Sequence, residues 1–177
     1  MSKKIIFMGT PIFAVPILKS LHLNGYPVTV VYTQPPKRSH RGQRVNKSAI
    51  QDTSENLNIN FRCPQKLKDN FQEYEFLKKM DADLSIVVAY GQIIPKEFLN
   101  LTKKGFFNIH ASILPKWRGA APIQRSIMNL DEEIGISIMK MNEHLDSGPL
   151  SNVYKIKLDK NLNAMEVSEK LSLLAAD

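Results

Sequence analysis

Short apolar, β-branched runs alternate along this chain with segments whose apolar residues recur at helical spacing. The runs Lys4–Met8, Val28–Thr33 and Leu84–Ala89 predict buried strands, because each is short and almost continuously apolar. Helical spacing predicts a helix over Phe13–Leu23, which Asn24-Gly25 would end as a C-terminal cap. Further strands are predicted over Ile59–Arg62, Gly105–His110, Gly135–Met141 and Leu150–Leu158, and further helices over Ser48–Asn56, Phe71–Met80, Ala121–Asn129 and Ala164–Ala176, with a short one after Pro95.

This order of elements predicts an α/β domain with a mostly parallel sheet and helices on both faces. A chain of 177 residues is long enough for one domain with a substantial core. The turn Gly9-Thr10-Pro11 after the first strand lacks the second and third glycines of the dinucleotide fingerprint, so it is weak evidence for a nucleotide site.

Composition narrows the class of protein. No apolar stretch is long enough to cross a bilayer, and the apolar run after Lys3-Lys4 ends at Gly9, which argues against a signal peptide. The single cysteine, Cys63, cannot form an internal disulfide and suits a reducing compartment. The four histidines are scattered, so no cluster has metal-ligand spacing. We expect a cytoplasmic protein with no metal site and no membrane contact.

Positive charge is concentrated in the first quarter of the chain, where eight basic residues precede the first acidic one, Asp52. Five of them lie in one segment with almost no apolar side chains. Such a segment is either a solvated loop or an arm that binds the phosphates of a nucleic acid by releasing counterions. Charge alone leaves both interpretations open. The five residues are Lys37, Arg38, Arg41, Arg44 and Lys47.

Two short segments carry the residues best suited to catalysis. Asn108 and His110 are two positions apart on a predicted strand, so both side chains emerge on one face, near the carboxyl end where parallel sheets bind ligands. Asp146 follows the strand Gly135–Met141, and its carboxylate there could fix the tautomer of the imidazole and stabilise the charged ring. Taken alone, an Asn-x-His pair is more often a satisfied polar pair, and Asp-Ser-Gly is an ordinary turn.

The residues that follow His110 change this balance. The run His110–Pro115 (HASILP) resembles the signature loop of the folate-dependent formyltransferases, and its extension Lys116–Gln124 (KWRGAAPIQ) is similar to the branch that acts on methionyl-tRNA. Departures from the family pattern are Ile113 for leucine, Pro36 for aspartate and His144 for glycine. The last departure bears on the loop before Asp146, because few side chains tolerate positive φ. The match runs in order from Lys4 to about Leu150 and includes Ile5–Pro11, Thr33–Pro35, Arg41-Gly42, Val87–Gly91 and Ile94-Pro95.

The resemblance implies a Rossmann-like fold and transfer of a formyl group from 10-formyltetrahydrofolate, a reduced folate, to the α-amine of initiator methionyl-tRNA. In this reaction we expect Asn108 and protonated His110 to donate to the developing formyl oxyanion. Asp146 would keep His110 charged and assist proton movement from the attacking amine to the leaving nitrogen. The residues expected to lie against the folate are Val88, Tyr90, Gly91, Ser112, Ile113, Leu114 and Pro115.

The resemblance also favours the phosphate-binding interpretation of the basic segment, because Arg41 matches an arginine that reaches the tRNA acceptor stem. Two side chains keep two interpretations each. Tyr90 is either a core aromatic or a folate contact, and Trp117 either packs the loop or lines the methionyl-adenosine end. Residues Lys37, Arg38, Arg41 and Arg44 are the predicted tRNA contacts.

The family continues into an OB-like domain that helps to hold the tRNA. This chain stops inside a helical pattern at Asp177, so residues 1–177 are either a fragment or a protein that consists of the catalytic domain alone, and the pattern favours a truncated chain. We also expect a monomer. Two rival functions remain. A formyltransferase for a sugar amine or glycinamide nucleotide would lack the full WRGAAPIQ run, and a non-catalytic RNA-binding module would not need Asn108, His110 and Asp146.

Overall fold

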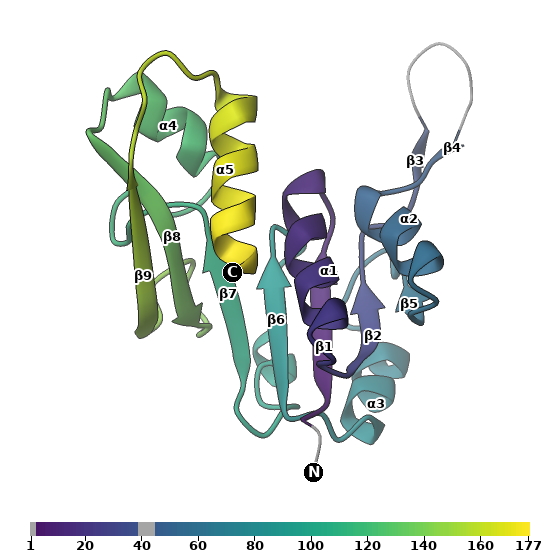
Figure 1. Ribbon diagram of the computed structural model, residues 1–177. Coiled ribbons are helices and arrows are strands. Elements are labelled where there is room, and N and C mark those ends of the chain that lie inside the picture. The colour runs from purple at the N-terminus through teal and green to yellow at the C-terminus, as the bar shows by residue number, and fades with distance from the viewer. Residues whose placement is uncertain (1–2, 39–44) are drawn as a thin grey trace.

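A seven-stranded sheet forms the centre of the structure, a computed structural model that describes residues 3–38 and 45–177 (Figure 1). The strand order is β5-β2-β1-β6-β7-β8-β9. The strands from β5 to β7 pair in parallel, whereas β8 and β9 are antiparallel to their neighbours. The strands are β1 (Ile5–Gly9), β2 (Val28–Tyr32), β5 (Phe61–Arg62), β6 (Leu84–Val88), β7 (Phe106–His110), β8 (Glu133–Lys140) and β9 (Leu150–Lys157).

The predicted α/β fold with a mostly parallel sheet is confirmed, and every helix and strand expected from the pattern is present with small shifts at its ends. The segment after Pro95 is a single turn of 3-10 helix. Within the described residues, no helix is long and apolar enough to cross a membrane. The helices are η1 (Ile12–Ala14), α1 (Val15–Leu23), α2 (Ala49–Asn56), α3 (Phe71–Lys79), η2 (Lys96–Phe98), α4 (Pro122–Met128) and α5 (Ala164–Ala176).

One part of the fold differs from the expectation. The basic segment was predicted to be a loop, but its described ends form a two-stranded antiparallel ribbon of β3 (Lys37–Arg38) and β4 (Val45–Asn46). Neither strand is apolar, so the hydrophobic pattern held no sign of it. The backbone pairing of β3 and β4 holds the two described ends of the segment side by side (Figure 1).

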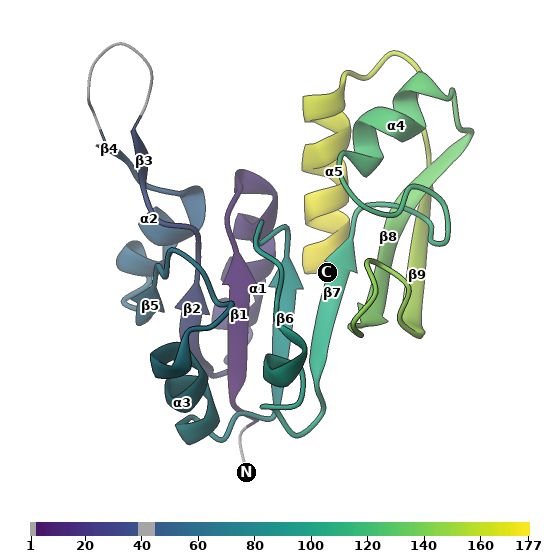
Figure 2. The same cartoon turned by 180° about the vertical axis from the view of Figure 1, so that it is seen from behind.

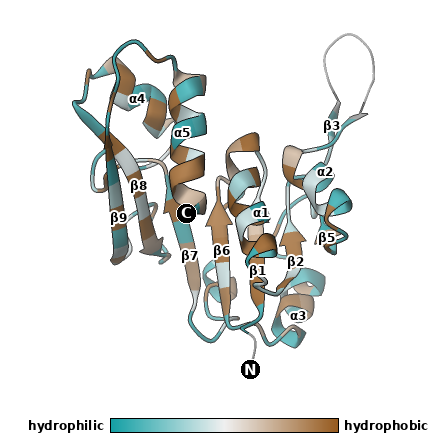
Figure 3. Cartoon of the chain, viewed as in Figure 1, coloured by the Kyte–Doolittle hydropathy of each residue, from teal (hydrophilic) through white to brown (hydrophobic). Residues whose placement is uncertain are grey.

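Two apolar cores lie on opposite faces of the sheet, as the apolar colouring of the central strands suggests (Figure 3). Because side chains alternate along a strand, neighbours in β1 enter different cores. Phe7 packs with Leu18 of α1 and Leu171 of α5, whereas Ile6 packs with Leu77 of α3. Helices α1, α2, α4 and α5 therefore cover one face, and α3 and η2 cover part of the other (Figure 2).

The same alternation in β7 positions the polar residues. Ile109 enters the core beneath α1 and α5, and Phe106 enters the opposite core. Asn108 and His110 project on the Phe106 side, towards the carboxyl end of β7. On this side of β7, segments 111–121 and 141–149 cover the sheet in place of a helix (Figure 2).

A buried ion pair ties α3 to the edge of the sheet. The guanidinium of Arg62 donates two hydrogen bonds of 2.7 Å to the carboxylate of Glu73, and the Tyr32 hydroxyl donates a third, also 2.7 Å. Burial opposes ionisation of Glu73, but the hydrogen bonds from Arg62 and Tyr32 outweigh it and hold the pKa of this carboxyl below its usual range. The network therefore depends on the charged form of Glu73.

We expect Glu73→Gln to lower the free energy of unfolding by about 2 kcal/mol at neutral pH, because Arg62 and Tyr32 lose a charged acceptor. A carboxyl whose folded-state pKa is lowered stabilises the fold above its unfolded pKa of about 4.3, and this contribution is lost as the pH falls further. Urea unfolding from pH 7 downwards should therefore show the gap between wild type and variant narrowing below that pH.

The control is Glu75→Gln on the same helix, since Glu75 makes no side-chain hydrogen bond or ion pair with another described residue. It should change stability by less than about 0.5 kcal/mol. Equal losses in the two variants, or a gap that widens towards acid pH, would contradict the assignment of the network.

Candidate active site

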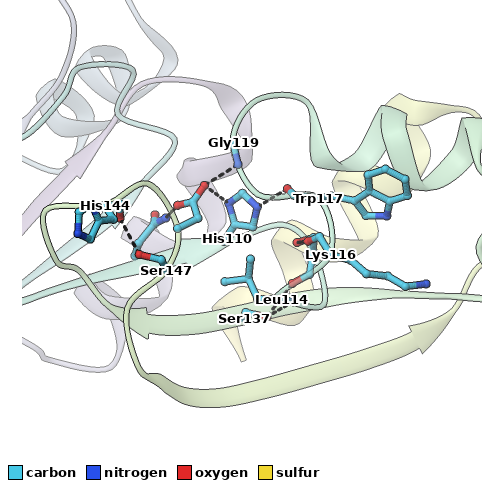
Figure 4. A network of polar contacts seen from close by, with 11 residues as sticks. His110, Leu114, Lys116, Trp117, Gly119, Ser137, His144 and Ser147 are labelled. Carbon is cyan, nitrogen blue, oxygen red and sulfur yellow. Dashed lines mark hydrogen bonds and ion pairs between the residues drawn. The ribbon is translucent and has the colours of Figure 1, made fainter.

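The carboxylate of Asp146 lies against β7 and the loop that follows it, where His110 and Gly119 come together (Figure 4). Asn108 Nδ2 donates to its Oδ1 at 3.1 Å, and the backbone N–H of Gly119 donates to its Oδ2 at 2.8 Å. His110 Nδ1 lies 3.5 Å from the same Oδ2. Asp146 and His110 are buried, with 9% and 7% of their surface exposed. The structure thus brings together the three side chains that the sequence singled out as catalytic.

Asp146 reaches this position by a reversal of the chain. β8 runs antiparallel to β7, so its end at Lys140 lies beside Phe107, at the start of β7. Segment 141–149 then returns towards the carboxyl end of β7. Gly148 allows this return, because a Cβ there would overlap the carbonyl oxygen of Lys140. Asp146 itself has φ of +45°, whereas His144 is not among the residues of positive φ, so the position of the family's glycine needs no left-handed backbone here.

Both ring nitrogens of His110 face oxygen acceptors. Nε2 lies 2.9 Å from the carbonyl oxygen of Trp117, and Nδ1 faces Asp146. A ring with hydrogens on both nitrogens satisfies both acceptors, whereas a neutral ring turns a lone pair towards one of them. Nε2 is thus positioned to donate to the Trp117 carbonyl, which leaves Nδ1 on the side of Asp146.

The loop after His110 is held by a serine from β8 that sequence reasoning missed. Ser137 is fully buried, and its Oγ donates to the carbonyl of Ser112 at 2.7 Å while accepting from the N–H of Leu114 at 3.0 Å. Within the loop, Ser112 Oγ donates to the carbonyl of Lys116 at 2.6 Å. The available signal was a lone hydroxyl in an otherwise apolar strand. The polar groups of Ser112 and Leu114 named here are thus already hydrogen-bonded, either within the loop or to Ser137 of β8.

The residues expected near the folate differ in what they can offer a ligand. Val88 and Tyr90 are at most 2% exposed and lie in opposite cores, so neither residue offers surface to a ligand in this structure. Gly91 is exposed with φ of +82°, and Gln34 Nε2 donates to its carbonyl while occupying the place of a Cβ. In the loop, Ser112 and Leu114 are buried, Ile113 is half-buried and Pro115 is exposed. The bond between Leu114 and Pro115 is cis.

Two of the four predicted tRNA contacts lie in the ribbon. Lys37 and Arg38 form β3, and Lys37 is exposed. Arg41 and Arg44 lie outside the described residues. Lys47, the last cation of the segment, is already paired with Glu55 of α2 at 2.6 Å. The basic segment is therefore anchored at this end by an ion pair within the domain.

The loop's aromatic side chain is held away from His110. Trp117 is half-buried, and its indole Nε1 donates to Asp131 Oδ2 at 2.6 Å. This contact supports the packing role of Trp117. Arg118 is exposed. Among residues 3–38 and 45–177, no group of three or more histidine, cysteine, aspartate or glutamate side chains is arranged to hold a metal ion.

Comparison with known sequences agrees with this geometry. A family model described as formyl transferase matches residues 3–175. The methionyl-tRNA formyltransferase of Pelagibacter ubique is 66% identical over the whole of this chain, which covers 57% of that relative. The methionyl-tRNA formyltransferase of Prochlorococcus marinus is 45% identical, with 98% of this chain and 53% of the relative covered. The chain thus spans little more than half the length of the curated relatives it matches.

Solved structures share the fold at low sequence identity. A phosphoribosylglycinamide formyltransferase from Bacillus halodurans superimposes with a TM-score of 0.81 and 16% identity, covering 98% of this chain and 90% of the other. A formyltetrahydrofolate deformylase from Pseudomonas syringae superimposes with a TM-score of 0.76 and 18% identity, covering 98% of this chain and 58% of the other. At these identities the likeness concerns the fold alone.

We expect Ser137→Ala to loosen the loop after His110, because it leaves the buried N–H of Leu114 and the carbonyl of Ser112 without their partner. Leaving such groups unsatisfied costs about 1–3 kcal/mol, which urea unfolding would measure. Hydrogen exchange at the Leu114 amide should accelerate. Ser151→Ala, at an exposed position of β9, is the control and should change neither quantity. Unchanged exchange at Leu114 in Ser137→Ala would count against this role for Ser137.

Proposed function

The chain belongs to the formyl transferase family, and on that premise we propose that it transfers a formyl group from 10-formyltetrahydrofolate to the α-amine of initiator methionyl-tRNA, for translation initiation. The observation that carries the proposal is the contact network of Asn108, His110 and Asp146, a set of groups suited to acyl transfer to an amine. Sequence relatives named methionyl-tRNA formyltransferase favour this acceptor over a small amine. We further infer a monomeric enzyme of the cytoplasm.

Asn108 is suited to stabilise the charge that develops in this reaction. When the amine attacks the formyl carbon, negative charge builds on the formyl oxygen. The Asn108 amide carries two hydrogens, and only one is donated to Asp146, so the second is available to that oxygen. The contact with Asp146 also fixes the amide plane, so the donor is oriented before the substrate arrives.

His110 and Asp146 are suited to handle the proton. The attacking amine must lose one proton, and N10 of the folate must gain one, so the enzyme's charge is unchanged over the cycle. Nδ1 of His110 shares the site with Asn108 and Asp146, and its 3.5 Å separation from Asp146 is longer than an ordinary hydrogen bond. Nδ1–H is therefore not committed to Asp146, whereas Nε2 is bonded to the Trp117 carbonyl. In this proposal Nδ1–H of the imidazolium donates to the reacting group, and the nearby carboxylate stabilises the charge of the ring.

The surroundings of the network fit a large, partly apolar substrate. Ile12 and Ile93 follow the carboxyl ends of the neighbouring strands β1 and β6 and are 72% and 90% exposed. Leu145, beside Asp146, is 73% exposed. Apolar side chains left exposed on the rim of a polar site favour a ligand that covers them. A reduced pterin and a methionine side chain both have this character.

We assign binding of the tRNA part of the acceptor to the basic segment. We propose that Lys37, Arg38, Arg41 and Arg44 contact tRNA phosphates, because a run of cations without acids gains affinity by releasing counterions. Lys47 is left out of this set, since its ion pair with Glu55 competes with any phosphate.

We expect His110→Ala, Asn108→Ala and Asp146→Ala in the full-length protein to nearly abolish formyl transfer from 10-formyltetrahydrofolate to methionyl-tRNA. Loss of one oxyanion donor alone costs on the order of a hundredfold in rate. Circular dichroism should show each variant folded. His22→Ala and Asn100→Ala remove the same groups at exposed positions and should retain wild-type rates. A folded His110→Ala enzyme that kept most of its rate would refute the mechanism, and preferred formylation of a small amine would refute the acceptor.

We expect Arg41→Gln and Arg44→Gln each to weaken tRNA binding and to reduce the log–log salt slope by about one unit, because each variant neutralises one phosphate fewer. Lys47→Gln is the matched control within the segment and should change the slope less, because Lys47 is paired with Glu55. Folate affinity should be unchanged in all three. Equal slopes in the arginine variants and wild type would show that the segment acts other than by binding phosphates.

A further inference from the structure

Another buried carboxylate, that of Asp131, lies between α4 and β8 and belongs to no part of the proposed chemistry. It is 8% exposed, and its oxygens accept from Trp117 Nε1 at 2.6 Å and from Asn129 Nδ2 at 2.8 Å, with Lys116 Nζ at 3.4 Å. Burial opposes its ionisation, but the hydrogen bonds from Trp117 and Asn129 outweigh this and keep the pKa of Asp131 below its ordinary value. Asp131 is therefore a charged acceptor at neutral pH.

The backbone of the residues that Asp131 holds faces the opposite way, towards the active site. The carbonyl of Trp117 accepts from Nε2 of His110 at 2.9 Å, and the carbonyl of Lys116 accepts from Ser112 Oγ at 2.6 Å. In Figure 4 the indole of Trp117 points away from His110 while its carbonyl faces the imidazole. Residues 116 and 117 are thus fixed from both sides, and Trp117 connects Asp131 to His110.

Packing alone does not hold this connection. Trp117 has φ of +58°, a left-handed conformation that a bulky residue keeps only when its surroundings enforce it. A cavity of about 490 Å³ lies beside the indole, lined among others by Ile113, Ser126 and Leu130. Because the indole borders open space, the hydrogen bond to Asp131 is the directional contact that sets its position.

We propose that Asp131 is a positioning residue for His110. By holding the Trp117 indole, it sets the carbonyl that receives the Nε2 hydrogen, and this fixes the ring so that Nδ1 faces Asp146. The imidazole is then oriented by two carboxylates, by Asp146 directly and by Asp131 through Trp117. The consequence for the rate rests on the proposed function, whereas the effect on the imidazole does not.

The kinetic test uses Asp131→Asn and Trp117→Phe in the full-length protein. The first keeps the size of the side chain and removes its charge, and the second replaces the indole by a smaller phenyl ring that has no N–H to donate to Asp131. Because small misplacements of a catalytic group cost up to about a hundredfold, we expect each variant to lower kcat about tenfold or more, with KM for the folate nearly unchanged. The double variant should be no slower than the slower single variant, since both changes break one connection.

Glu132→Gln is the matched control. It makes the same change of charge at the next residue. The side chain of Glu132 is exposed and has no hydrogen bond to another described residue, and its backbone carbonyl accepts from the N–H of Leu158. It should keep wild-type kcat. Effects of Asp131→Asn and Trp117→Phe that simply add would overturn the proposal, as would a loss in KM alone.

The spectroscopic test needs no substrate and reads the connection directly. Trp117 is the only tryptophan of these 177 residues, so in a ¹⁵N-labelled sample of the full-length protein its indole N–H signal is the one that Trp117→Phe removes. We expect Asp131→Asn to shift this signal and speed its exchange, and both Asp131→Asn and Trp117→Phe to move the ring ¹⁵N signals of His110. Glu132→Gln should move neither set.

The two tests separate the inference from the function on which its kinetic part rests. His110 signals that move while the rate of transfer stays at the wild-type value would support the positioning by Asp131 and refute the catalytic role of His110. Ring signals of His110 that stay unchanged in both variants would overturn the inference, whatever happens to the rate. If Asp131→Asn does not fold, Trp117→Phe alone still decides the matter through the His110 signals.

Discussion

The hydrogen bonds to one buried carboxylate, that of Asp146, organise the candidate site. A carboxylate with so little exposure is unfavourable unless donors surround it, and here the donors are the Asn108 amide and the Gly119 backbone, with the His110 imidazole facing it at 3.5 Å. Asn108 and His110 come from β7, and Gly119 comes from the loop between β7 and α4. The contacts of Asp146 therefore hold β7, the loop after it and the connection between β8 and β9 in one arrangement. The same contacts orient the polar groups that are proposed to act on the substrate.

Because β8 and β9 are antiparallel, the chain needs an additional reversal to bring Asp146 to the carboxyl end of β7. A helix crossover to a further parallel strand would bring the next connection to the carboxyl edge of the sheet by itself. Because β8 runs the other way, segment 141–149 starts at the far edge and must return along β7. The return requires a glycine at 148, where a side chain would meet the backbone of Lys140, and a left-handed residue at 146. Backbone that unusual is maintained only where strong contacts hold it, and the donors to Asp146 supply them.

What the sequence predicted correctly was local. Apolar runs and helical spacing located the elements, and the period of two placed Asn108 and His110 on one face without any tertiary information. The approach of Asp146 was expected from motif order, although the direction of β8 was not. Two of the missed features are contacts between different segments, Ser137 with the loop and Asp131 with Trp117, whereas the third, the pairing within the basic ribbon, is local but has no apolar pattern. A single polar residue in an apolar context marks burial of a polar group but does not reveal its partner, so such contacts need the fold.

The basic ribbon and the expected folate surface are separate in sequence, but both are connected to Gln34. Gln34 lies three residues before β3, its backbone N–H donates to Thr10 Oγ1, and its side-chain amide donates to the carbonyl of Gly91. Thr10 in turn donates to the carbonyl of Tyr90, so the ends of β1, β2 and β6 are tied at one point. Substitutions beyond Lys37 change the charge of the ribbon without touching this point. A change at Gln34 removes a hydrogen bond to the backbone of Gly91. Gln34 is therefore the residue through which the two proposed substrate surfaces are coupled.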